Sequence, residues 1–215
     1  MLTVGQVLLT AGQLNGYTAG MAKAYTRLDN DERRRQLIEL GEDLFTRHAF
    51  DEVSMAQIAR EAGISKALLY HYFPSKRDYF VATLSEGAEA LRAAVEPAPG
   101  AAPLQALTDS VGAYLAWVDA HGDGYRKLLQ SAGSIPEVRQ LVEGVRDETA
   151  GRIIDGLALT DPLARTAVHG WLWFLDGACL HWLDHREVEP EALRDMVVGA
   201  LLASLGAAGA VTAEG

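Results

Sequence analysis

Hydrogen-bond donors are concentrated in one short segment of the sequence, SMAQIAREAGISKALLYHYFPSK, which spans residues 54–76. Its second half carries two lysines, two tyrosines and a histidine: Lys66, Tyr70, His71, Tyr72 and Lys76. Ammonium, hydroxyl and imidazole groups, together with the N-termini of helices, bind phosphate groups. The sequence has no Gly-rich phosphate loop and no serine nucleophile elbow. The segment therefore indicates binding of a phosphate backbone.

Two short helices are predicted to position these donors. Ser54 is a good N-cap for the first helix, and Gly63 can end it by adopting the left-handed conformation. Ser65 is a second N-cap, and Pro74 stops the helix that follows it. Two helices joined by a tight Ala-Gly-Ile turn have the spacing of a helix-turn-helix, whose second helix can lie in the major groove of DNA.

Packing must hold the second helix in place, because so short a helix is not stable alone. Leu69 and Phe73, four residues apart, are expected to face inward, which leaves the donors on the outer faces. Two interpretations stay open for part of this set. The serines can act only as helix caps, and Tyr70 or Tyr72 can belong to the core with a solvated hydroxyl.

Residues 33–84 resemble the N-terminal signature of the tetracycline-repressor (TetR) family. The resemblance is carried by Leu44-Phe45, Phe50, Ser54, Ile58-Ala59, Ala62-Gly63-Ile64-Ser65-Lys66, Leu69-Tyr70, Tyr72-Phe73 and Ser75-Lys76. It implies a homodimer that binds a palindromic operator in double-stranded DNA and leaves it when a small molecule binds a C-terminal domain. It also implies that the following residues face DNA: Ser54, Ser65, Lys66, Ala67, Leu68, Tyr70, His71, Tyr72 and Lys76. Ala49 and Ala67 stand where the family often has glycine, which leaves the operator sequence open.

The distribution of charge agrees with such a module. The 215-residue chain has a net charge of −10, which by itself argues against nucleic acid. Residues 23–84, however, contain ten Lys and Arg against ten Asp and Glu, and residues 53–80 contain four against two. The excess negative charge therefore belongs to the rest of the chain.

The whole chain is predicted to be all-α, with about nine helices and no internal repeat. We expect a disordered extension over 1–22, a three-helix DNA-binding domain over 23–80, a helical ligand-binding and dimerisation domain over 81–207 and a flexible tail over 208–215. Proline and glycine break the pattern near 96–103. The later helical stretches are expected near 104–121, 125–132, 136–158, 162–186 and 190–207, with a joint at Gly122-Asp123-Gly124.

The C-terminal part concentrates aromatic residues. Candidate residues for an apolar ligand pocket are Tyr114, Trp117, Tyr125, Trp171, Phe174 and Trp182. The alternative is that they form only the core and a dimer interface, since residues 171, 175, 179 and 182 recur at helical spacing. Asp176, if it faces inward, would favour a cationic ligand. The resemblance implies that helices near 162–186 and 190–207 form the dimer.

Metal and cofactor chemistry is not indicated. His181 and His185 are four residues apart, but the order His-Trp-Leu-Asp-His lacks the glutamate of the zinc-binding HExxH motif. We therefore expect no metal, no cofactor and no catalytic residue. Cys179 is the single cysteine and the longest apolar runs are shorter than a membrane span, which fits a cytoplasmic protein with no membrane partner.

Two classes of function remain. The first is a dimeric repressor released by a small hydrophobic effector, with a transcriptional activator or a ligand-blind DNA-binding regulator as the alternative. The second is a small all-α enzyme or binding protein in which the helix-turn-helix is only architectural. The clustered donors favour the first class, because a purely architectural motif needs none of them.

Overall fold

A computed structural model describes residues 30–210, and all regular structure in that range is helical. A helix over residues 30–47 is followed by η1 (Phe50–Glu52), α2 (Met55–Glu61), α3 (Lys66–Tyr72), α4 (Lys76–Ala94), α5 (Pro103–Ala120), α6 (Gly122–Ala132), α7 (Pro136–Gly156), α8 (Pro162–His185) and α9 (Pro190–Ala207). This confirms the all-α prediction. The expected extension over 1–22 and the end of the expected tail lie outside the described residues. Within residues 30–210, no helix is both long enough and apolar enough to cross a bilayer.

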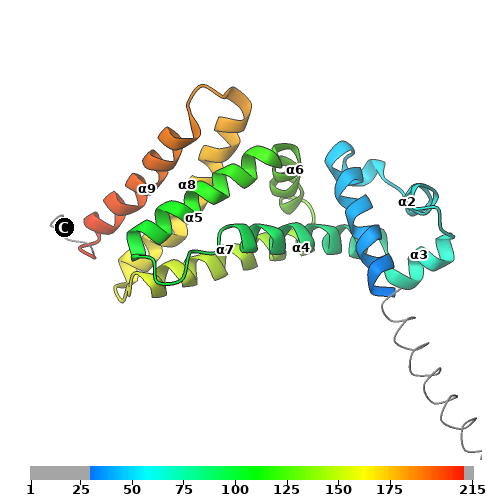
Figure 1. Cartoon of the computed structure of the whole chain (residues 1–215), viewed down its shortest axis with the longest axis horizontal. Helices are drawn as coiled ribbons and strands as arrows, with labels where there is room; N and C mark the ends of the chain where they lie inside the picture. The colour runs from blue at the N-terminus through cyan, green and yellow to red at the C-terminus, as the bar shows by residue number, and fades with distance from the viewer. Residues whose placement is uncertain (1–29, 211–215) are drawn as a thin grey trace, which may run out of the picture.

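The helices form two units that α4 connects. Figure 1 shows α2 and α3 at one end of the molecule and α9 near the other, with α4 leading from the first unit into the second. The buried residues fall into two clusters, one for each unit. Ile135, Val138 and Val142 of α7 and the segment before it pack into the N-terminal cluster. The expected boundary at residue 80 therefore lies inside a continuous helix, and the two units share packing at their junction.

A close helix approach fixes α4 to the first described helix. The buried Tyr79 hydroxyl donates a hydrogen bond of 2.5 Å to the backbone carbonyl of Leu37. Burial raises the pKa of Tyr79, so the phenol stays a donor. Gly41 makes this contact possible, because it brings no side chain to the place where Tyr79 and Thr83 lie.

The prediction of a loop between two helices at residues 122–124 is wrong. These residues form the first turn of α6, and the break between α5 and α6 is reduced to His121, which caps the end of one helix and precedes the other. Gly122 serves packing here, since a Cβ at this position would lie 2.9 Å from Leu183 Cδ2. The glycine lies in a helix that contacts α8, and not in a loop.

Replacing Gly41 by alanine is expected to lower the free energy of unfolding by about 1–3 kcal/mol through overpacking. The added Cβ would overlap Thr83 Oγ1 and lie 2.9 Å from Tyr79 Oη, and both side chains are buried. Gly144 on α7 is the matched control, because a Cβ there meets nothing within 4 Å. Alanine at 144 should raise the free energy of unfolding by about 0.5–1 kcal/mol. Denaturant unfolding measures both, and equal stability of the two variants would contradict the assignment.

Candidate functional site

The turn between α2 and α3 is closed by backbone hydrogen bonds. Gly63 has a φ of +65°, and its N–H donates to the carbonyl of Arg60 at 3.2 Å. The N–H of Ile64 donates to the carbonyl of Ala59 at 3.0 Å. This pair of bonds is a Schellman motif, which satisfies the last carbonyls of α2 and turns the chain into α3.

Serine side chains cap both helices of this motif. The Ser54 Oγ accepts from the N–H of Gln57 at 3.2 Å, and the Ser65 Oγ accepts from the N–H of Leu68 at 3.1 Å. Both capping predictions are confirmed. Each hydroxyl proton is still available for a further acceptor, so a phosphate contact by Ser54 or Ser65 stays a prediction.

The outer face of α3 presents unpaired donors. Leu69 and Phe73 are buried, as predicted, and they hold the helix on the core. Lys66, Tyr70 and His71 point outward, with Tyr70 44% exposed. Within the described residues, the side-chain polar atoms of these three make no hydrogen bond or ion pair to protein groups. Ala67 and Leu68 are exposed beside Lys66 at the start of the helix.

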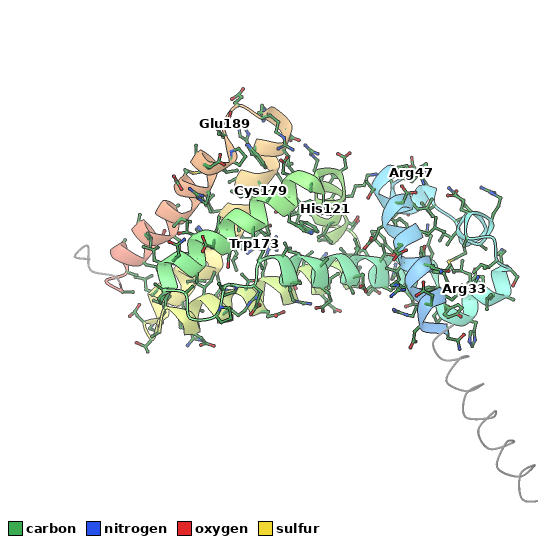
Figure 2. The ribbon with its side chains drawn as sticks, in the orientation of Figure 1. Arg33, Arg47, His121, Trp173, Cys179 and Glu189 are labelled. Atoms are coloured by element: carbon green, nitrogen blue, oxygen red, sulfur yellow. The ribbon has the colours of Figure 1, made fainter. Side chains whose placement is uncertain are left out.

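Two residues predicted to contact DNA also make contacts inside the protein. The Lys76 ammonium donates to the backbone carbonyl of Phe50 at 2.9 Å and lies 4.2 Å from the centre of its ring. The Tyr72 hydroxyl donates to Asn30 Oδ1 at 3.0 Å. Lys76 therefore fixes η1 to α4, and Tyr72 fixes α3 to the first described helix. Figure 2 shows Arg33 at the end of that helix that lies beside α3.

A cavity of about 800 Å³ lies among α4, α5, α6, α7 and α8. Aliphatic and aromatic side chains from all five helices make up most of its walls, and charged residues lie among them. Four of the six aromatic residues predicted to line a pocket border it: Tyr114, Trp117, Tyr125 and Trp171. The volume is within the roughly 300–1,000 Å³ of pockets that take small molecules.

Phe174 and Trp182 do not line this cavity, so their prediction as lining residues is wrong. Phe174 is 42% exposed on the outer side of α8, because it is rotated by about 100° from the inward-facing Leu175. Trp182 is buried elsewhere: its indole N–H donates to the carbonyl of Val188 at 2.9 Å, and the Arg186 guanidinium lies 4.2 Å from the centre of its ring. Trp182 therefore stabilises the connection between α8 and α9.

A hydrogen-bonded carboxylate lies on the wall of the cavity. Asp176 Oδ1 accepts from the hydroxyls of Tyr125 at 2.7 Å and Tyr114 at 3.1 Å. Asp176 Oδ2 accepts from Nε and Nη2 of Arg146 at 3.0 and 2.5 Å. Burial, with the nearby carboxylate as a second cause, raises the pKa of the Tyr114 hydroxyl. Asp176 does face inward, and Arg146 already pairs with it, so this carboxylate gives no reason to expect a cationic ligand.

Arg146 was missed by the sequence analysis, although a signal for it exists. Val138, Val142, Ala150 and Ile154 form the buried stripe of α7 at steps of four and eight residues, and position 146 falls on this stripe. Asp176 falls in the same way among the buried residues of α8. Opposite charges on two apolar stripes predict a buried ion pair, because an unpaired charge is costly there.

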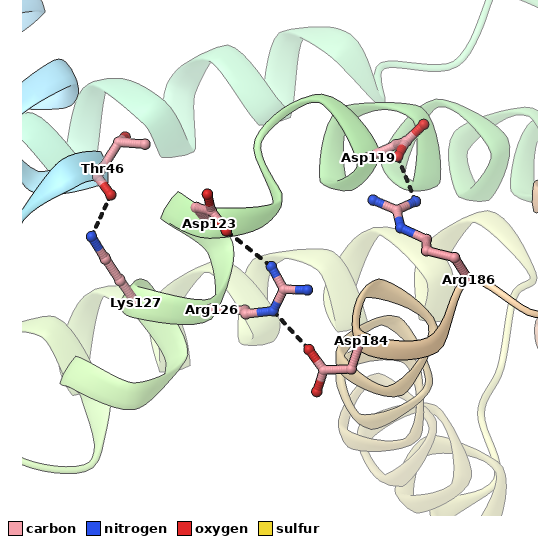
Figure 3. Close-up of polar contacts among 7 residues, drawn as sticks. All are labelled: Thr46, Asp119, Asp123, Arg126, Lys127, Asp184 and Arg186. Carbon is pink, nitrogen blue, oxygen red and sulfur yellow. Dashed lines mark hydrogen bonds and ion pairs between the residues drawn. The ribbon is translucent and has the colours of Figure 1, made fainter.

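Helix α6 contacts both units. The Lys127 ammonium donates to the backbone carbonyl of Thr46, near the end of the first described helix (Figure 3). A cation is favourable there, because the last carbonyls of a helix lack partners within it. On its other side, α6 is held to α8 through Arg126, which contacts Asp123 at 3.1 Å and Asp184 at 2.9 Å (Figure 3). Contacts at the cavity can therefore reach the N-terminal unit through α6.

Two histidines of α8 contact each other at the surface, and the cysteine of the same helix is buried. His181 and His185 are exposed, their rings stack with centroids 4.1 Å apart, and Nδ1 of His185 lies 2.9 Å from the His181 carbonyl oxygen. Cys179 is buried, and burial together with the nearby Asp176 raises its pKa to about 12. A thiol with so high a pKa is unreactive at neutral pH.

Replacing Lys76 by methionine is expected to lower the free energy of unfolding by about 0.5–1.5 kcal/mol. Methionine keeps the aliphatic stem but loses the hydrogen bond to Phe50 and the contact of the charge with its ring. Lys66→Met is the control, because Lys66 is exposed and should change stability by less than about 0.5 kcal/mol. Urea unfolding compares the two. Wild-type stability of the Lys76 variant would mean that its ammonium is available for a phosphate.

Comparison with known proteins gives two family matches along the chain. Residues 37–83 match the family described as "Bacterial regulatory proteins, tetR family", and residues 103–204 match "Tetracyclin repressor-like, C-terminal domain". The two matched segments correspond to the helix-turn-helix unit and to α5–α9.

Solved structures and relatives agree with these matches. A tetR-family transcriptional regulator from Streptomyces coelicolor is 32% identical, covers 84% of this chain and 83% of its own, and has a TM-score of 0.73. The transcriptional activator FasR of Mycolicibacterium smegmatis is 30% identical over 53% of this chain and 52% of its own length. The transcriptional regulator HbdR of an Aromatoleum species is 30% identical over 58% and 56%. The chain thus spans about half the length of these two relatives. With both units matched, the chain belongs to the TetR family of bacterial regulatory proteins.

Proposed function

We propose that this protein is a dimeric, ligand-responsive transcriptional repressor that binds a palindromic operator through α3. The observation that carries the proposal is the outer face of α3, where Lys66, Tyr70 and His71 are exposed and their polar atoms make no hydrogen bond or ion pair within the described chain. The Schellman turn and the serine caps fix the orientation of this helix on the core. Donors placed in this way fit the phosphates and base edges of a major groove.

The cavity supports a small-molecule effector. It is large enough for a small ligand, and its apolar walls favour a hydrophobic one. An effector changes DNA affinity only if it binds one conformational state of the dimer better than the other. Helices α4 and α6 are suited to this coupling, since both border the cavity and both contact the N-terminal unit.

The outer sides of α8 and α9 support a homodimer. Large apolar side chains are exposed there: Leu163, Trp173 and Phe174 on α8 and Met196 on α9. The buried side chains of both helices already pack within one chain, so these residues are left for a second copy. Small residues such as Gly170, Gly177 and Gly199 lie among the exposed positions and allow close approach of helices.

A transcriptional activator is the second candidate, because the relative FasR is named as one. Both roles use the same DNA and effector sites. They differ in where the bound DNA lies relative to the promoter, so a transcription assay with the bound fragment in its native position distinguishes them.

Selection from a random duplex pool, followed by gel shifts, tests DNA binding. We expect wild-type protein to enrich a near-palindromic sequence. Lys66→Ala should change the preferred sequence, since Lys66 opens the helix that reaches the base edges. Tyr70→Phe should weaken all sequences about equally, since its hydroxyl is expected on a phosphate. Arg165→Ala, on the exposed start of α8, is the control and should bind normally. No enrichment by the wild type would disprove DNA recognition.

Introducing glutamate at Met196 or Phe174 should convert a dimer into monomers. A charge placed in an apolar interface loses its hydration without gaining a partner. Glu at Arg139 of α7 is the control, because this position is outside the α8–α9 face and should leave the dimer intact. Sedimentation velocity at several protein concentrations measures the oligomeric state of each variant. A stable dimer in both α8 and α9 variants would place the interface elsewhere.

A further inference from the structure

The Arg146–Asp176 pair places two compensating charges on a wall of the cavity, beside apolar residues such as Leu172 and Leu175. Both side chains are only 15% exposed. The carboxylate accepts four hydrogen bonds, two from tyrosine hydroxyls and two from the guanidinium. A carboxylate has about four acceptor positions, so Asp176 has none left for a ligand. The guanidinium in turn has its charge matched by Asp176.

Other charged residues border the cavity as well, including Glu42 and Lys127, which form no ion pair within the described chain. Arg92 forms ion pairs with Glu89 and with Glu148, and Arg152 lies 3.5 Å from Glu96. These side chains are more exposed than the central pair, so water screens them. Next to the Arg146–Asp176 pair the wall therefore offers no unbalanced charge to an ionic ligand, and an ion placed there gives up hydration without compensation.

The cavity is long in one direction. Helix α4 borders it from Phe80 through Leu84, Ala88 and Leu91 to Val95, at a helical spacing of three to four residues. The fifteen steps from residue 80 to residue 95, at about 1.5 Å each, extend over roughly 22 Å. A cavity of about 800 Å³ with one such wall suits a chain-like molecule.

We propose that the Arg146–Asp176 pair makes the cavity selective for elongated, uncharged molecules and excludes carboxylates and ammonium ions of the same chain length. The proposal deepens the effector site of the proposed function and rests on it for its biological role. Neutral groups such as a hydroxyl fit the pair, because they lose less hydration beside it than an ion does.

Three ten-carbon compounds that differ only in their head group test the selectivity on the wild-type protein. They are 1-decanol, decanoate and decylammonium at neutral pH, and tryptophan fluorescence reports binding because Trp117 and Trp171 border the cavity. We expect decanol to bind at least tenfold more tightly than either ion. Equal or tighter binding of one ion, or no response to any of the three, overturns the proposal.

Charge-changing variants then assign the selectivity to the pair. Asp176→Asn leaves Arg146 unmatched and should shift the preference at least tenfold toward decanoate. Arg146→Gln leaves Asp176 unmatched and should shift it at least tenfold toward decylammonium. The double variant should again prefer decanol. A merely structural role of the pair would not restore this preference. Unchanged selectivity in all three folded variants overturns the proposal, and the wild-type series decides it if a variant fails to fold.

Two controls change the charge by the same amount outside the cavity. Asp155→Asn on α7 and Arg165→Gln on α8 are exposed and should keep the wild-type selectivity. Gel shifts of the same preparations without any additive report on DNA binding separately. If the protein binds DNA but does not prefer decanol, only the inference about the pair is overturned. If it prefers decanol but does not bind DNA, only the proposed function as a regulator is overturned.

Discussion

A single, largely buried carboxylate joins four helices of the C-terminal unit. Asp176 on α8 accepts hydrogen bonds from Tyr114 on α5, Tyr125 on α6 and Arg146 on α7. A charge next to an apolar cavity must be paired and hydrogen-bonded, or the group is too costly to bury. Removing one partner of such a pair typically costs about 3–5 kcal/mol. These four helices can therefore surround a cavity without collapsing into it, because their relative positions are fixed by directional bonds as well as by apolar packing.

The position of the recognition helix depends on this arrangement through α6 and α4. Tyr125 of α6 touches the carboxylate, and Lys127, two residues later, holds the end of the first described helix at Thr46. The N-terminal half of α4 belongs to the core of the helix-turn-helix unit, and its later residues border the cavity. A ligand that moves either helix by a small amount thus acts on α3 through packed and hydrogen-bonded contacts. The structure provides the contiguous elements that an effector response needs.

Sequence reasoning and structure agree where the signal is local. The caps at Ser54 and Ser65 and the turn at Gly63 involve residues no more than five positions apart, so a short pattern is sufficient to predict them. The inward direction of Leu69 and Phe73 follows from helical periodicity. Periodicity was less useful for Phe174, because both faces of α8 are apolar and a pattern without a polar side does not show which face is inward.

The sequence alone determined the helical class, the helix-turn-helix and the set of donors on α3, because each depends on residue types within a few turns of one helix. Only the tertiary structure decided which donors stay available. Lys76 finds its partner 26 residues earlier in the chain, Tyr72 finds one 42 residues earlier, and Arg146 meets Asp176 30 residues later. Such contacts depend on how helices pack against one another. A side chain that looks free in the sequence therefore becomes a structural contact when packing brings a carbonyl, an amide or a carboxylate within hydrogen-bonding distance.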